Sequence, residues 1–175
     1  MVDLTKELAE NQTILLVVPS SKYGDILIDT ARQLSKKPTS YVTLNKSFQS
    51  LRDLFEKNRV NVKNILFIDA ITKTIKDVED RTDQCYFVSS PGALTDLSLI
   101  ISNFLHHNFD YLIFDSLSSL MIYQEKAVVQ KFVLNLVNKI KESKTRAVFY
   151  ALSTKEHEDF IKQCSLFVDK VIDLS

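Results

Sequence analysis

The sequence predicts an α/β protein in which a mainly parallel central sheet carries helices on both faces. Short apolar runs alternate with longer segments of helical period, and these runs lack the polar alternation of half-exposed strands. No linker, internal repeat or low-complexity stretch divides the 175 residues, a length that suits one domain. We therefore expect residues 1–175 to form a single domain built on one parallel sheet.

The strands are predicted where the apolar runs are continuous over about four to six residues, a length typical of buried parallel strands. In chain order they are Thr13–Val18, Tyr41–Leu44, Ile65–Asp69, Cys85–Val88, Tyr111–Phe114, Ala147–Leu152 and Val168–Ile172.

The helices are predicted between these strands, where apolar residues recur at the spacing of one helical face. They are Ile26–Lys36, Ser47–Lys57, Ala93–His106, Lys126–Ser143 and Thr154–Cys164. Ser47, Thr154 and Asp25 are suitable N-cap residues for three of them. The stretch Ile71–Gln84 is rich in Lys, Thr and Asp and is interpreted as a surface connection.

The composition limits the classes of function. The 22 basic and 22 acidic residues give a formal net charge of zero, which argues against a strongly electrostatic nucleic-acid binder. Cys85 and Cys164 are isolated in apolar runs, so we expect buried free thiols in a reducing compartment. No apolar run reaches the ~18 residues of a membrane span, and the N-terminus lacks a signal-peptide core. We expect a cytoplasmic protein without a membrane partner.

One motif carries a family resemblance. The segment Tyr111–Leu120 reads Y-L-I-F-D-S-L-S-S-L, an apolar strand that ends in Asp115-Ser116 and continues with small hydroxyl residues. It resembles the Walker B segment of RecA/KaiC-type ATPases, in which the Asp lies at the carboxyl end of a central strand and helps to hold Mg²⁺. The resemblance extends in order from about Thr13 to Leu174, and it implies a three-layer RecA-like (KaiC-like) fold. The segment Cys85–Leu97 more closely resembles a subgroup of small, mainly archaeal KaiC-like proteins that are regarded as inactivated.

The chain departs from that family where phosphate would bind. A Walker A loop, G-x-x-x-x-G-K-[ST], wraps phosphates with backbone N–H groups, a Lys and a hydroxyl. Here Tyr23 and Gly24 stand where the Lys and the Ser/Thr would be, and Asn45 and Lys46 stand where the family has catalytic glutamates. The resemblance thus implies a vestigial nucleotide site, no ATP hydrolysis and no cofactor. The vestigial positions are Ser20, Ser21, Lys22, Tyr23, Gly24, Asn45, Lys46, Asp115 and Ser116.

Two of these features have alternative interpretations. Asp115 either coordinates a cation or caps the following turn, with Ser116 and Ser118 hydrogen-bonding locally. The Ser20–Lys22 segment either binds an anion at the next helix or is an ordinary loop capped by Asp25, with Tyr23 in the vacant phosphate space. No metal site is expected, because no Cys or carboxylate cluster accompanies the histidines His106, His107 and His157.

The function predicted from these observations is a non-catalytic protein-interaction or regulatory module of signal transduction, with a protein partner or self-association. One alternative is a nucleotide- or anion-binding domain with a remodelled loop, although weak or no nucleotide binding is expected. Another is a DNA-recombination accessory protein, against which the neutral charge argues. The loops at the carboxyl edge of the sheet are the expected contact surface. The residues predicted for this edge are Tyr23, Lys46, Ser89, Ser90, Ser118, Ser119, Tyr123 and Ser153.

Overall fold

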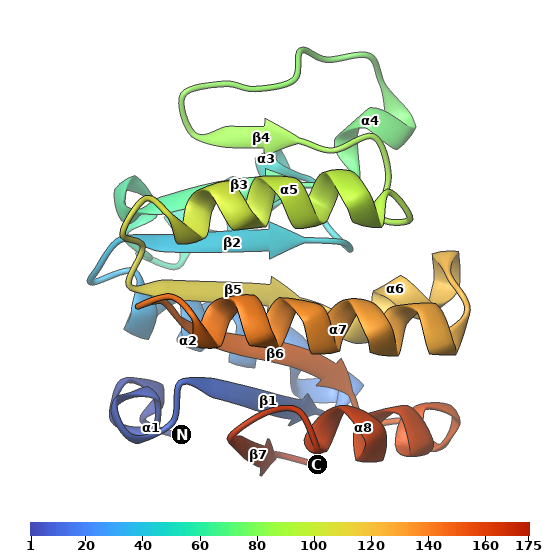
Figure 1. Cartoon of the computed structure of the whole chain (residues 1–175). Helices are drawn as coiled ribbons and strands as arrows, with labels where there is room; N and C mark the ends of the chain where they lie inside the picture. Colours follow the sequence, from blue (N-terminus) through green and yellow to red (C-terminus); the bar gives the residue numbers. More distant parts are fainter.

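The computed structural model describes residues 1–175 and has a seven-stranded sheet at its centre (Figure 1). Every strand pair is parallel, and the strand order is β4-β3-β2-β5-β6-β1-β7. The predicted α/β class and parallel sheet are confirmed. The strands are β1 (Thr13–Val18), β2 (Thr39–Thr43), β3 (Ile65–Asp69), β4 (Cys85–Phe87), β5 (Tyr111–Asp115), β6 (Arg146–Leu152) and β7 (Lys170–Asp173).

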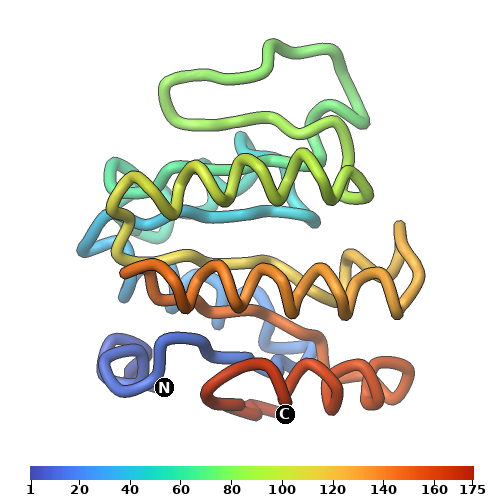
Figure 2. Tube along the Cα trace, viewed as in Figure 1, coloured from blue at the N-terminus to red at the C-terminus, as the bar shows by residue number.

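Helices cover both faces of this sheet, as Figures 1 and 2 show. On one face lie α1 (Leu4–Glu10), α2 (Tyr23–Leu34) and α3 (Phe48–Lys57). On the other lie α5 (Leu94–Leu105), α6 (Leu117–Tyr123), α7 (Lys126–Lys141) and α8 (Glu158–Ser165). The short elements are α4 (Thr72–Ile75) and the 3₁₀ turns η1 (Ser20–Lys22), η2 (Val62–Asn64) and η3 (Lys155–His157).

The strands are buried on both faces because their apolar side chains alternate between two cores. In β1, Leu15 and Val17 pack against α5–α8, whereas Ile14, Leu16 and Val18 pack against α1–α3. This alternation follows from the two-residue period of a strand, and it explains why the strand sequences are apolar throughout.

Most predicted elements are confirmed to within a few residues. Strand β2 begins two residues earlier than predicted and β7 two residues later, and the other main differences lie at helix starts. Ser47 caps α3 as predicted, since its side chain accepts from the Ser50 N–H. Asp25 is not an N-cap: α2 begins at Tyr23, and Asp25 lies in its first turn. Thr154 precedes the 3₁₀ turn η3 rather than α8, and its hydroxyl has no hydrogen-bond partner. The helices α1, α4 and α6 were not predicted.

The connection between β3 and β4 is mostly irregular, as expected, but it folds back along β4. Arg81 pairs with Tyr86 in an antiparallel bridge. The Phe87 N–H donates to the Asp80 carbonyl and the Thr82 N–H to the Cys85 carbonyl, both at 2.8 Å. This segment therefore covers part of the outer edge of β4 (Figure 1).

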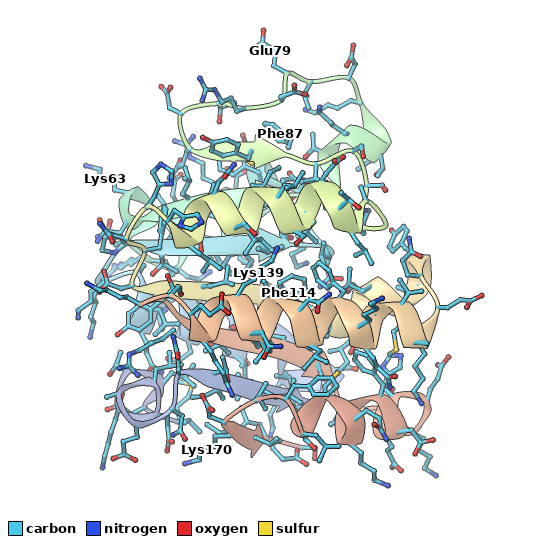
Figure 3. All side chains as sticks on the ribbon, viewed as in Figure 1. Lys63, Glu79, Phe87, Phe114, Lys139 and Lys170 are labelled. Carbon is cyan, nitrogen blue, oxygen red and sulfur yellow. The ribbon has the colours of Figure 1, made fainter.

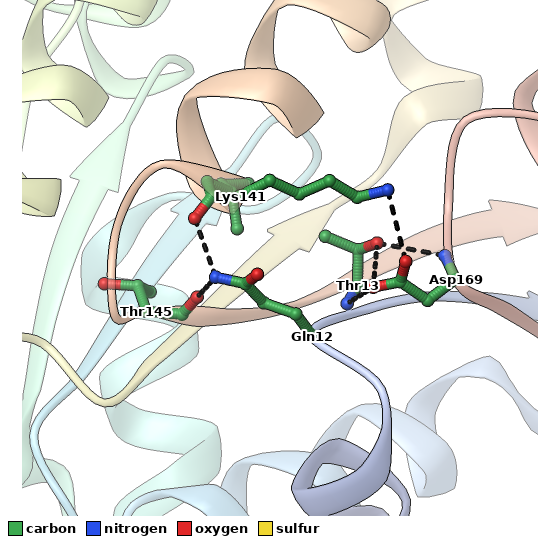
Figure 4. A network of polar contacts seen from close by, with 6 residues as sticks. Gln12, Thr13, Lys141, Thr145 and Asp169 are labelled. Atoms are coloured by element: carbon green, nitrogen blue, oxygen red, sulfur yellow. Dashed lines mark hydrogen bonds and ion pairs between the residues drawn. The ribbon is translucent and has the colours of Figure 1, made fainter.

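A polar network fixes the amino end of β1 against the last turn of α7 (Figure 4). The Gln12 amide nitrogen donates to the carbonyls of Ile140, Ser143 and Thr145 at 2.8–3.0 Å. Beside it, the Asp169 carboxylate accepts from the Thr13 N–H and hydroxyl and pairs with the Lys141 ammonium at 3.1 Å. A glutamine thus joins the residue before β1 to the last turn of α7 and to the segment that follows this helix.

Two further sequence expectations concern the whole chain. Cys85 and Cys164 are both buried and unpaired, as predicted. None of the helices has the length and apolar character needed to cross a lipid bilayer.

Candidate functional site

The carboxyl edge of the sheet brings together the loops that follow β1, β2, β5 and β6, because these strands are neighbours in the sheet. In an open α/β sheet this edge is the usual position of ligand sites. At its centre stands Asp115, the last residue of β5, which is fully buried. The peptide bond between Asp115 and Ser116 is cis.

The Asp115 carboxylate accepts hydrogen bonds from three side chains that come from three different parts of the chain. The Tyr23 hydroxyl, at the start of α2, donates to Oδ1. The Tyr41 hydroxyl, in β2, donates to Oδ2 at 2.7 Å. The Asn45 amide, in the loop after β2, donates to Oδ1 at 2.9 Å. The acceptor capacity of this carboxylate is therefore largely taken up by the protein itself.

The electrostatics of this cluster follow from its burial. Burial raises the pKa of Asp115 to about 6, and the hydrogen bonds from Tyr23, Tyr41 and Asn45 act in the opposite direction. Burial and the nearby Asp115 charge raise the pKa of both Tyr23 and Tyr41. These hydroxyls therefore keep their protons at neutral pH and serve as hydrogen-bond donors.

Tyr23 fills the space beside Asp115. Its ring meets that of Tyr150 edge to face, with centroids 6.4 Å apart. Its hydroxyl also accepts from the Asn45 amide at 3.2 Å. The Asn45 side-chain oxygen in turn accepts from the Ser119 hydroxyl. Tyr23 is thus held between Asp115, Asn45 and Tyr150 at the start of α2.

The serines that follow Asp115 are structural. Ser116, not Asp115, caps α6, since its hydroxyl accepts from the Ser119 N–H at 3.3 Å. The Ser118 hydroxyl accepts from the Leu152 N–H at 2.8 Å. Ser118 and Ser119 are only 2% and 5% exposed, so they contribute little of the surface at this edge. The expectation that Asp115 caps a turn was wrong, because its oxygens face Tyr23, Tyr41 and Asn45.

The other predicted site residues lie at the surface of the same edge. Ser20, Ser21, Lys22, Gly24, Lys46 and Ser89 are exposed, whereas Ser90 and Ser153 are partly buried. The Ser89–Gly92 loop follows β4, two strands away from β2, but the Gln124 amide donates to the Gly92 carbonyl at 2.9 Å and joins it to the end of α6.

An apolar tip, formed by Ile122 and Tyr123 at the end of α6, projects from this edge. These two side chains are 78% and 47% exposed. The sequence reasoning included Tyr123 but missed Ile122, because α6 was interpreted as a turn. The apolar residues Leu120, Met121 and Ile122, which follow the serines, could have indicated that this segment is a helix.

A groove of about 630 Å³ lies beside the apolar tip. Charged and polar side chains form most of its walls, so its chemistry suits polar contacts more than a purely apolar ligand. It is lined by Asn45, Ser118, Ser119, Met121, Ile122, Gln124, Glu125, Lys126, Leu152, Glu156 and His157. No group of three or more His, Cys, Asp or Glu side chains in the chain has the arrangement of a metal site.

Comparisons with known proteins find similarity among solved structures. No protein-family model matches the chain, and no curated protein matches it significantly. Among solved structures, a KaiC-like protein from the hyperthermophilic archaeon Pyrococcus horikoshii is similar, with a TM-score of 0.61 and 15% identity. The similarity covers 94% of this chain and 72% of that chain. At this identity the likeness concerns the fold alone: the chain has a RecA-like α/β fold similar to that of a KaiC-like protein.

Proposed function

We propose that this protein is a non-catalytic domain of RecA-like fold that acts through protein contacts, as an interaction or regulatory module. The observation that carries the proposal is that the protein's own side chains take up the hydrogen-bonding capacity of the Asp115 carboxylate. This carboxylate is fully buried, and it accepts from Tyr23, Tyr41 and Asn45 instead of facing an open site. Phosphoryl transfer needs several positioned groups at once. The loop after β1 lacks the glycines of a phosphate-binding loop, and Tyr23 and Gly24 stand at the positions of its Lys and Ser/Thr.

The contact surface proposed for this module is the apolar tip of Ile122 and Tyr123, together with the groove beside it. Interaction hot spots are enriched in aromatic side chains. The hydrogen bond from the Gln124 amide to the Gly92 carbonyl ties the end of α6, and with it the tip, to the Ser89–Gly92 loop. A pre-positioned apolar tip loses little conformational freedom when a partner binds.

The test of this surface is self-association and partner binding by variants that keep the fold. Ile122→Asp and Tyr123→Ala remove the apolar tip. Leu99→Asp is the matched control, because Leu99 is a 60% exposed apolar residue on α5, away from the carboxyl edge. Analytical ultracentrifugation over a concentration series measures self-association, and surface plasmon resonance measures an identified partner. We expect the tip variants to weaken association at least tenfold and Leu99→Asp to leave it unchanged. Equal effects of all three variants would exclude the tip as the contact.

A second candidate is a nucleotide- or anion-binding domain with a remodelled loop. One observation favours it: Ser20, Ser21 and Lys22 are exposed directly before α2, a helix of 12 residues without a side-chain cap. Helix N-termini attract anions. Asp25 in the first turn of α2 opposes this attraction. Calorimetry with nucleotide separates the two candidates: micromolar affinity that Lys22→Ala abolishes supports the second, and affinity no tighter than millimolar supports the first.

A further inference from the structure

A second groove, of about 520 Å³, lies at the opposite, amino edge of the sheet, where α5 and α7 both end. It differs from the carboxyl-edge groove in being lined almost entirely by polar side chains, with Leu105 as its one hydrophobic residue. Its other lining residues are Ser102, His106, Asn108, Lys139, Glu142, Ser143, Lys144 and Thr145. Figure 3 shows Lys139 on α7, directed toward α5.

Lys139 is a partly buried cation without an ionic partner. Its ammonium donates to the hydroxyls of Ser98 and Ser102, both at 3.0 Å, and forms none of the ion pairs in the structure. Lysine is seldom buried without a compensating charge. An ammonium has three N–H donors, so two serine hydroxyls leave one donor for a group in the groove. The positive charge is therefore held in place but not neutralised.

The ends of two helices normally repel an anion, because their last carbonyls carry partial negative charge. Several carbonyls at and just beyond these helix ends are hydrogen-bonded within the chain. The Gln12 amide donates to the carbonyls of Ile140, Ser143 and Thr145, a contact set that Figure 4 shows in part. At the end of α5, the Asn103 carbonyl accepts from the His106 N–H. The usual repulsion at this edge is thereby reduced.

The charged side chains of the groove favour an anion. Lys139 and Lys144 contribute two ammonium groups, and Glu142 contributes the single carboxylate. Hydroxyl and amide groups of Ser102 and Asn108 stand among them. Lysine binds phosphate as a compact point charge that needs no fixed fork geometry. The volume is also within the range of small-ligand sites, roughly 300–1,000 Å³.

We propose that this groove binds a phosphate-type oxyanion, either free phosphate or the phosphate group of a larger molecule, with Lys139 as its central ligand. This site is separate from the carboxyl edge, and the proposal does not depend on the interaction role argued above.

The test is a titration of the full chain with inorganic phosphate at constant ionic strength, with chloride as the balancing anion. Backbone amide NMR shifts report binding and its position. Lys139→Gln removes the charge but keeps most of the side-chain stem. Lys131→Gln is the matched control, because it removes the same charge from an exposed position of the same helix. We expect saturable shifts at Ser102, Asn108 and Lys144 in the wild type and in Lys131→Gln, and at least a tenfold weaker affinity in Lys139→Gln.

A parallel titration with O-phosphoserine identifies the source of the phosphate. Tighter binding of phosphoserine than of inorganic phosphate indicates a phosphate ester, and equal or weaker binding indicates free phosphate. Absence of saturable phosphate binding in the wild type overturns the proposal, as does equal affinity in Lys139→Gln and the wild type. If Lys139→Gln does not fold, as judged by thermal unfolding, Lys144→Gln replaces it: a loss of at least threefold supports the site, and an unchanged affinity overturns it.

Discussion

Tyr23 donates its hydroxyl hydrogen to the carboxylate of Asp115, 92 residues later in the chain. This contact joins the first residue of α2 to the last residue of β5. The Tyr23 side chain therefore lies across the carboxyl edge of the sheet, beside the end of β5. It is the relationship on which the proposed loss of catalysis depends, and it can be tested through stability.

Removal of the Tyr23 hydroxyl should destabilise the fold. Tyr23→Phe keeps the ring beside Tyr150 but takes one donor from a fully buried carboxylate. The expected loss is about 1.5–3 kcal/mol of unfolding free energy, the usual contribution of a hydrogen bond to a charged group. Urea denaturation measures it. Tyr123→Phe is the control, because Tyr123 is 47% exposed, and it should change the unfolding free energy by less than about 0.5 kcal/mol. Equal effects of the two variants would argue against the Tyr23–Asp115 contact.

The buried Asp115 should make stability depend on pH in a defined direction. Its pKa is raised from 3.8 to about 6 in the folded protein, so the folded state holds this proton while the unfolded state releases it. The contribution is fully present below pH 3.8 and is lost as the pH rises through 6. The difference corresponds to about 3 kcal/mol.

Asp115→Asn isolates this contribution from the other carboxyl groups. Urea unfolding of both proteins between pH 4 and 7.5 should show that the wild type loses stability relative to the variant as the pH rises. Most of that loss should occur by pH 7, because the pKa of Asp115 lies near 6. Parallel stability profiles of the two proteins would mean that Asp115 does not titrate in this range.

ATP hydrolysis should be absent. The chain lacks the Walker A groups. Asn45 and Lys46 stand at the positions where KaiC-type ATPases, which the sequence resembles, have their catalytic glutamates. An amide does not titrate, and an ammonium is a poor general base at neutral pH. Phosphate release with Mg²⁺ and ATP measures turnover, and calorimetry should give an affinity no tighter than millimolar. Turnover by the wild type that disappears in Asp115→Asn would refute this prediction, because a contaminating ATPase would be unaffected by the substitution.

The Gln12 side-chain amide, which joins the amino end of β1 to the end of α7, should stabilise the fold. Gln12→Leu removes the amide donor from the carbonyls of Ser143 and Thr145, whereas the Ile140 carbonyl keeps the Ser143 N–H and hydroxyl as donors. We expect a loss of about 1–3 kcal/mol in urea denaturation. Gln163→Leu is the control, because Gln163 is exposed on α8 and its side chain makes no hydrogen bond within the chain. A Gln12→Leu variant as stable as the wild type would show that water replaces the amide at these carbonyls.

The fold could be predicted from the sequence because its strands are continuous apolar runs and its main helices are strongly periodic. The strands Thr13–Val18 and Ile65–Asp69 have the predicted bounds. Helix α6 was missed because its serines are typical of turns. In the structure their hydroxyls are satisfied within the helix start and by the Leu152 N–H, a contact between distant segments that local sequence does not reveal.

The candidate site could be predicted only in part. The convergence of Tyr23, Asn45 and Asp115 follows from parallel strands whose carboxyl ends meet at one edge. The role of Tyr41 could not be predicted, because it lies within a buried strand, where an aromatic residue is ordinarily a core residue. The start of α2 was placed too late because Asp25 is a good cap, whereas the 3₁₀ turn η1 leads directly into Tyr23.

The fold-back of residues 80–82 along β4 makes the two edges of the sheet unequal in their free backbone hydrogen-bonding groups. At that end the Asp80 and Cys85 carbonyls and the Phe87 and Thr82 N–H groups are paired within the chain. At the other end, β7 has only β1 as a neighbour. Backbone groups on a free strand edge can pair with a further strand. The edge of β7 is therefore the more open of the two for pairing with a further strand, and the charges of Lys170 and Asp173 at its ends restrict which sequences fit there.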